Sequence, residues 1–72
     1  MNKEFLQKFA QNLKRIRKSK GIKQDDFLIV EGISRSLISM VETAKTDITL
    51  SKLKIIADTL GVEPKDLLDF KD

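Results

Sequence analysis

The sequence predicts a small all-α protein, a compact five-helix domain of 72 residues. Two observations support this. Apolar residues recur at helical spacings of three and four along most of the chain, and Gly, Ser, Thr or Pro stands at most of the expected helix boundaries. No stretch alternates apolar and polar residues for long enough to predict a strand. The nearest candidate, residues 47–50, is better interpreted as a loop entering a helix.

The first predicted helix, residues 3–20, is amphipathic. Its apolar face carries side chains spaced by four, four and three residues, namely Phe5, Phe9, Leu13 and Ile16. Basic residues gather in its last turns, where they complement the helix dipole, and Gly21 is expected to end it. Basic amphipathic helices also occur as membrane-surface or calmodulin-target segments, but the domain's own core is the simpler use of this face.

A short second helix is expected from residue 23 or 24 to Val30, with Phe27 as its clearest core residue. Residues 27–30 are all apolar and cover the whole circumference of an α-helix. We interpret this segment as buried more completely than usual. An exposed patch that binds a partner protein is the alternative.

A tight turn at Gly32 separates this helix from a third, whose first backbone N–H groups Ser34 can cap. Ile38 and Val41, three residues apart, are its core residues. The other face has one guanidinium among uncharged side chains, a surface suited to base edges in a DNA groove: Arg35, Ser36, Ser39 and Met40. Residues 24–43 therefore indicate helix, tight turn, helix, and favour DNA binding.

A fourth helix is predicted to begin near Thr49 or Ser51, either of which can cap it, and to stop at Gly61. Pro64 predicts the start of a fifth helix. The C-terminal region, about residues 60–72, is the candidate dimerisation surface because apolar residues there extend beyond the main core: Leu60, Val62, Leu67, Leu68 and Phe70. The alternative is that they pack as a fifth helix within one monomer, and both can hold.

Composition excludes several kinds of site. The chain has no Cys and no His, which removes disulfides, the usual zinc ligands and histidine acid–base catalysis. It also lacks a phosphate-cradling glycine loop, so an enzyme is the weakest hypothesis, and we expect no cofactor, metal or small-molecule ligand. The longest apolar run, residues 27–30, is far shorter than the ~20 residues that span a bilayer. A cytoplasmic protein without a membrane partner is the default expectation.

Charge is distributed unevenly along the chain. Residues 1–24 contain eight Lys or Arg against one acidic residue, whereas residues 58–72 contain five acidic residues against two Lys. A basic region attracts polyanions such as DNA, and the acidic end would avoid them. On charge alone, a lysine-rich face that serves solubility is the more economical interpretation.

Four segments in order carry a resemblance to a known family: LKRIRKSKGIKQDDF, GISRSLISMVE, LSKLKIIADTLGV and EPKDLL. The chain resembles the Xre or lambda-repressor type of helix-turn-helix DNA-binding domain over residues 9–70. The loop entering Ile48 and the segment 34–39 are also similar to the small controller proteins of restriction-modification systems. Phage-type repressors and antitoxins share the same frame.

The resemblance implies a homodimeric transcriptional regulator that binds double-stranded DNA at an inverted repeat, with the third helix in the major groove. Base contacts then fall on Ser34, Arg35, Ser36, Ser39 and Met40. Arg35 is the best candidate, because a guanidinium can bind guanine bidentately, and a phosphate contact is its alternative role. Phosphate contacts fall on Gln24, Lys45, Thr46 and Thr49. Arg17 and Glu42 match a structural ion pair of the family.

Four residues depart from the family pattern. Lys23 replaces the Ser or Thr that caps the second helix, which should weaken that helix by about 1 kcal/mol. Leu28 replaces an alanine at a close helix contact, Ala44 replaces a glycine that ends the recognition helix, and Asp47 brings negative charge to the DNA-facing loop. The rival from another class is a protein-interaction module that uses residues 27–30 or the C-terminal apolar residues.

Overall fold

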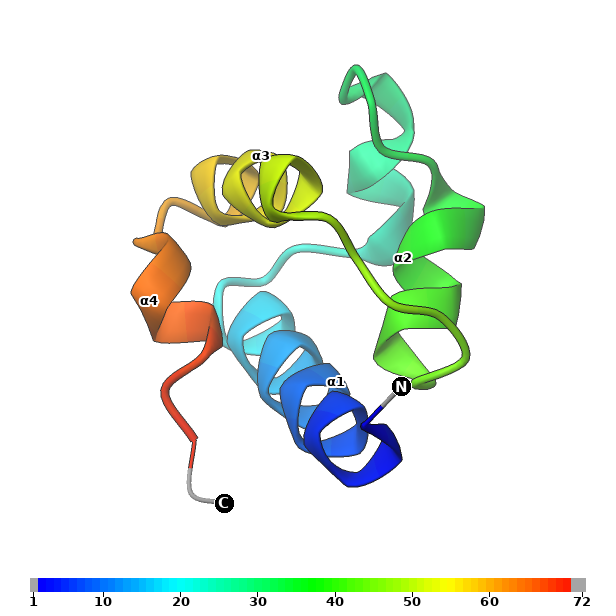
Figure 1. Cartoon of the computed structure of the whole chain (residues 1–72). Coiled ribbons are helices and arrows are strands. Elements are labelled where there is room, and N and C mark those ends of the chain that lie inside the picture. The colour runs from blue at the N-terminus through cyan, green and yellow to red at the C-terminus, as the bar shows by residue number, and fades with distance from the viewer. Residues whose placement is uncertain (1, 71–72) are drawn as a thin grey trace.

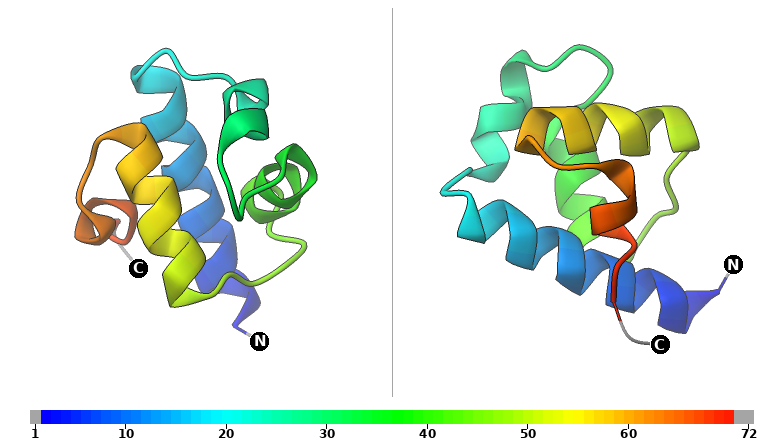
Figure 2. Two further views of the ribbon diagram at one scale, coloured as in Figure 1. Left: turned by 90° about the horizontal axis from the view of Figure 1, so that it is seen from above. Right: turned by 90° about the vertical axis from the view of Figure 1, so that its left-hand side faces the viewer.

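The structure is a computed structural model that describes residues 2–70, and in this range the chain forms five helices and no strand. These are α1 (Lys3–Ser19), η1 (Gln24–Ile29), α2 (Arg35–Glu42), α3 (Leu50–Leu60) and α4 (Pro64–Leu67). α1 and α3 form the middle of the molecule, with η1 and α2 on one side and α4 on the other (Figure 1, Figure 2). The predicted all-α fold is confirmed. No helix in the described range is long and apolar enough to cross a membrane.

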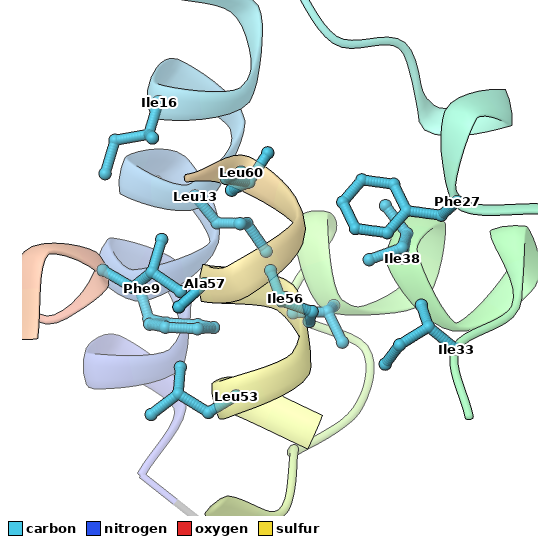
Figure 3. Close-up of a cluster of buried hydrophobic side chains, with 12 residues drawn as sticks. Phe9, Leu13, Ile16, Phe27, Ile33, Ile38, Leu53, Ile56, Ala57 and Leu60 are labelled. Carbon is cyan, nitrogen blue, oxygen red and sulfur yellow. The ribbon is translucent and has the colours of Figure 1, made fainter. Parts of the chain in front are cut away.

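One apolar core joins all five helices. Figure 3 shows α1 and α3 facing each other through their apolar side chains, while Phe27, Ile33 and Ile38 approach Ile56 of α3 from the other side. Every helix contributes one of the largest fully buried side chains, which are Leu13, Phe27, Ile38, Ile56 and Leu67. All five helices are therefore packed on one shared core.

The helix starts follow local rules that the sequence already contained. The Ser34 hydroxyl accepts a hydrogen bond from the Leu37 N–H at 3.0 Å, and the Thr49 hydroxyl accepts one from the Lys52 N–H at 3.2 Å. Pro64 is the first residue of α4. Lys23 gives η1 no side-chain cap, as its replacement of Ser or Thr predicted.

Three helices end in the same motif, in which two backbone N–H groups beyond the helix return to carbonyls of its last turn. The motif needs one residue with left-handed backbone angles. After α1 and α3 this residue is glycine, with φ of +70° at Gly21 and +72° at Gly61. After α2 it is Ala44, with φ of +57°, a conformation that is strained for a residue with a Cβ atom.

The turn between η1 and α2 requires glycine for two reasons. Gly32 has a φ of +88°, which other residues rarely adopt. A Cβ atom at this position would also lie 3.3 Å from the Cδ1 atom of Ile55 in α3. The turn therefore packs directly against α3.

The expected burial of residues 27–30 is confirmed for Phe27 but was wrong for Leu28 and Ile29, because η1 is a 3₁₀-helix with three residues per turn. Gln24, Phe27 and Val30 repeat at that period and face the protein. The residues between them face solvent: Leu28 is 66% exposed and Ile29 is 94% exposed. The Leu28 side chain, which replaces an alanine expected at a close helix contact, therefore points to solvent and does not push η1 away from α2.

The fifth helix packs within the monomer. Leu60 and Leu67, two residues of the predicted dimer surface, lie in the chain's own core and offer no surface to a partner. The buried Asn12 side chain of α1 donates hydrogen bonds to the carbonyls of Asp66 and Leu67, at 3.1 and 2.9 Å. These contacts and Leu67 hold α4 against α1.

Part of the predicted dimer surface stays accessible. Leu68 is 43% exposed, and Val62 and Phe70 are half-buried. The Phe70 ring packs against Phe5 of α1 with 5.3 Å between ring centroids. Residues 71 and 72, also part of the predicted region, lie outside the described residues.

Replacing Ala44 by Gly is expected to stabilise the protein by about 1 kcal/mol, because glycine adopts left-handed backbone angles without strain. Urea denaturation followed by circular dichroism measures the change. The matched control is Gly61→Ala, which creates the same conflict after α3 with no atom within 4 Å of the new Cβ. It should destabilise by a similar amount. An Ala44→Gly protein no more stable than wild type would contradict the strain.

Candidate nucleic-acid interface

The exposed face of α2 collects the residues predicted to read bases. Arg35, Ser36 and Met40 are exposed and Ser39 is half-buried, whereas Ile38 and Val41 on the opposite face are buried in the core. Ser34 precedes the helix, and its hydroxyl already accepts the capping hydrogen bond, so its O–H donor and one lone pair remain. The face has one cation and is otherwise uncharged.

A buried ion pair fixes the end of α2. Nε and Nη2 of Arg17 in α1 donate to the two carboxylate oxygens of Glu42, the last residue of α2, at 2.6 and 3.0 Å. Both side chains are almost completely buried. A third side chain, Gln24 of η1, joins this pair, and its Nε2 donates a hydrogen bond to Glu42 Oε1 at 3.1 Å. The predicted pair of Arg17 and Glu42 is thus present, and it ties α1, η1 and α2 together.

The side chain of Gln24 is therefore engaged within the protein. It was predicted to contact a phosphate, and one of its amide hydrogens is taken by Glu42. Its carbonyl oxygen and second amide hydrogen have no hydrogen bond among residues 2–70. A phosphate contact from Gln24 would use that second hydrogen.

A second ion pair joins η1 to the start of α2. Nε of Arg35 lies against Oδ1 of Asp25, and both side chains are more than half exposed. Arg35 is thus directed by a carboxylate of its own chain. This contact was not predicted from the sequence, because the two residues lie on different helices with a turn between them.

The loop after α2 carries the remaining phosphate candidates. Lys45 is exposed and directly follows the strained Ala44, and Thr46 is half-buried. The Thr49 hydroxyl accepts the cap hydrogen bond of α3, and its O–H remains available to donate to a phosphate. Asp47 accepts a hydrogen bond from the Ile48 N–H at 2.7 Å, which turns its charge toward the loop's own backbone.

Comparison with known proteins agrees with this geometry. The helix-turn-helix family model matches residues 13–67. Control protein C.BamHI from Bacillus amyloliquefaciens is 38% identical over 63 residues, covering 86% of this chain and 78% of that protein. The high-resolution crystal structure of the restriction-modification controller protein C.AhdI from Aeromonas hydrophila matches with a TM-score of 0.80 at 32% identity. It covers 86% of this chain and 94% of that one.

Fold and site together define a helix-turn-helix protein, and the chain belongs to that family. Within the family it is similar to the control protein C.BamHI and to the restriction-modification controller C.AhdI. The resemblance inferred from the sequence is confirmed.

Removing the carboxylate of Glu42 should be strongly destabilising, because it leaves the Arg17 guanidinium buried without its counter-charge. We expect Glu42→Ala to lower the free energy of unfolding by about 3 to 5 kcal/mol in urea denaturation. The control is Asp58→Ala, which removes an acid paired with Lys54 on the exposed side of α3. It should cost less than about 1 kcal/mol. Equal losses in the two variants would show that the buried pair does not fix α2.

Proposed function

We propose that the protein is a transcriptional regulator that binds an inverted-repeat DNA site as a homodimer, with α2, the third helix, in the major groove. The single observation that supports this most is the face of α2. Its core side is fixed by Ile38, Val41 and the buried pair at Glu42, and its other side presents Arg35 among small and flexible uncharged residues. A rigid helix with such a face suits direct reading of base edges.

The names of two similar proteins support a more specific role for this regulator. C.BamHI is described as a control protein and C.AhdI as a restriction-modification controller protein. We extend this role to the present chain and propose that it controls transcription in a restriction-modification system.

The contacts are assigned by chemistry. Arg35 reads guanine, because its guanidinium can donate two parallel hydrogen bonds to O6 and N7. Ser34, Ser36, Ser39 and Met40 line the same groove. Lys45, Thr46, Thr49 and the free amide hydrogen of Gln24 contact phosphates and set the register on the duplex without reading sequence.

The proposed dimer is supported by the size of the domain compared with an inverted-repeat site. The longest extent of the described chain is 31 Å, and half-sites of an inverted repeat lie about 34 Å apart, so one copy covers one half-site. Accessible apolar residues near the C-terminus supply the contact, namely Val62, Leu68 and Phe70. Leu68 also borders an apolar groove of about 240 Å³ that includes Phe5 and the 82% exposed Leu50.

A second candidate function has one specific observation in its favour. The exposure of Leu28 and Ile29 at the end of η1 leaves adjacent apolar side chains with no partner in the core. This suits a module that binds another protein. Gel shifts on random DNA discriminate the two functions, because a pure protein-binding module should show almost no salt-dependent shift at moderate salt.

Selection of bound sequences from a random DNA pool tests the proposed function, and an inverted repeat is the expected result. Arg35→Ala should weaken binding to that site by about 1 to 3 kcal/mol of binding free energy. It should also relax the preference for one base pair in each half-site. Lys45→Ala should instead weaken all sequences alike and flatten the salt slope by about one unit. Recovery of no sequence preference would refute the proposal. Uniform weakening by Arg35→Ala would assign that residue to phosphate.

Leu68→Asp should give monomers in sedimentation and loss of tight operator binding, because a carboxylate would be buried in the proposed contact. Leu68 is the better site for this test, since Asp at the fully buried Leu67 would disrupt the monomer core. Ile29→Asp is the matched control, an exposed apolar residue at the other side of the molecule. A Leu68→Asp protein that remains dimeric would exclude this surface.

A further inference from the structure

The structure assigns Asp25 a role in DNA recognition: it is a positioning residue that holds the Arg35 guanidinium for reading guanine and thereby sharpens sequence preference. This inference rests on the proposed function. It comes from the ion pair between Asp25 in η1 and Arg35 at the first position of α2, two helices that lie side by side (Figure 1, Figure 2).

The pair is not needed to hold the fold. Its side chains are 52% and 66% exposed, and ion pairs in water contribute little to stability. η1 and α2 are already joined by buried Phe27 and Ile38 and by the hydrogen bond from Gln24 to Glu42. The neighbouring acid, Asp26, has a local role, since it accepts the backbone N–H of Lys23 at 2.8 Å. Asp25 has no such role, and its contact is with Arg35.

The geometry leaves the reading edge of Arg35 free. The carboxylate lies against Nε, on one edge of the guanidinium. The other edge, formed by Nη1 and Nη2, donates no hydrogen bond to any residue in the range 2–70. Two parallel N–H groups on this edge are what the O6 and N7 acceptors of guanine require. Asp25 therefore restricts the long side chain without occupying the donors that read the base.

The same carboxylate acts in two opposite ways. A side chain that is ordered before binding loses less rotamer freedom on contact. This corresponds to about a three- to tenfold gain in affinity for DNA with the correct base. A negative charge beside the groove also repels phosphates, which weakens binding to every sequence. Asp25 is thus expected to lower general DNA affinity and to raise discrimination, a combination that a structural residue would not produce.

The test compares wild type with Asp25→Asn, Arg35→Ala and the double variant on three duplexes. These are the selected inverted repeat, the same repeat with the base pair read by Arg35 replaced, and a random sequence. Asp25→Asn should reduce the affinity ratio of the first two duplexes about three- to tenfold and bind random DNA as tightly as wild type or more tightly. In the Arg35→Ala background, Asp25→Asn should leave that ratio unchanged.

The control is Asp58→Asn, which also neutralises an exposed carboxylate in an ion pair, on α3. It should leave the affinity ratio unaltered. The inference is overturned if Asp25→Asn keeps the wild-type ratio, if it weakens all three duplexes equally, or if Arg35→Ala itself changes no base preference. These three outcomes count against the inference alone, because the wild-type protein still selects an inverted repeat in each of them. A wild-type protein with no selected sequence would instead refute the proposed function, and this inference with it.

Discussion

The orientation of α2 depends on the buried contact between Arg17 and Glu42. α2 has only eight residues, and a helix of that length is not stable alone. Glu42 also stands at the C-terminal end of α2, where the helix dipole disfavours a carboxylate. Its charge is tolerated because Arg17 binds both oxygens and Gln24 adds a third hydrogen bond. α2 cannot tilt without exposing or separating this pair, so the interior of the protein sets the position of the exposed face of α2.

Features governed by short-range rules could be predicted from the sequence. Ser34, Thr49 and Pro64 mark helix starts because each acts on backbone groups within one turn, and these positions match the structure. The left-handed angles of Ala44 follow from the same kind of rule. The pairing of Arg17 with Glu42 spans 25 residues, and the resemblance to a known family supplied it, not local pattern.

The errors have physical causes as well. Periodicity at 3.6 residues per turn placed Leu28 and Ile29 inside, and the 3₁₀ geometry of η1 turns both outward. Leu67 looked available to a partner because the sequence cannot show that α4 folds back onto α1. The contact of Asp25 with Arg35 depends on the turn at Gly32, which brings the start of η1 beside the start of α2. No spacing rule links residues across such a turn.

The hydrogen bonds from Asn12 to α4 have a consequence for local unfolding. A helix of four residues has a single turn and gains little from its own hydrogen bonds, so it persists through Leu67 and the two carbonyls that Asn12 caps. Opening of this segment would leave the Asn12 Nδ2 group without its two acceptors and expose the core at Leu67. Amide hydrogen exchange in α4 therefore reports how firmly this helix is packed on α1. α1 and α4 thus open together as one cooperative unit.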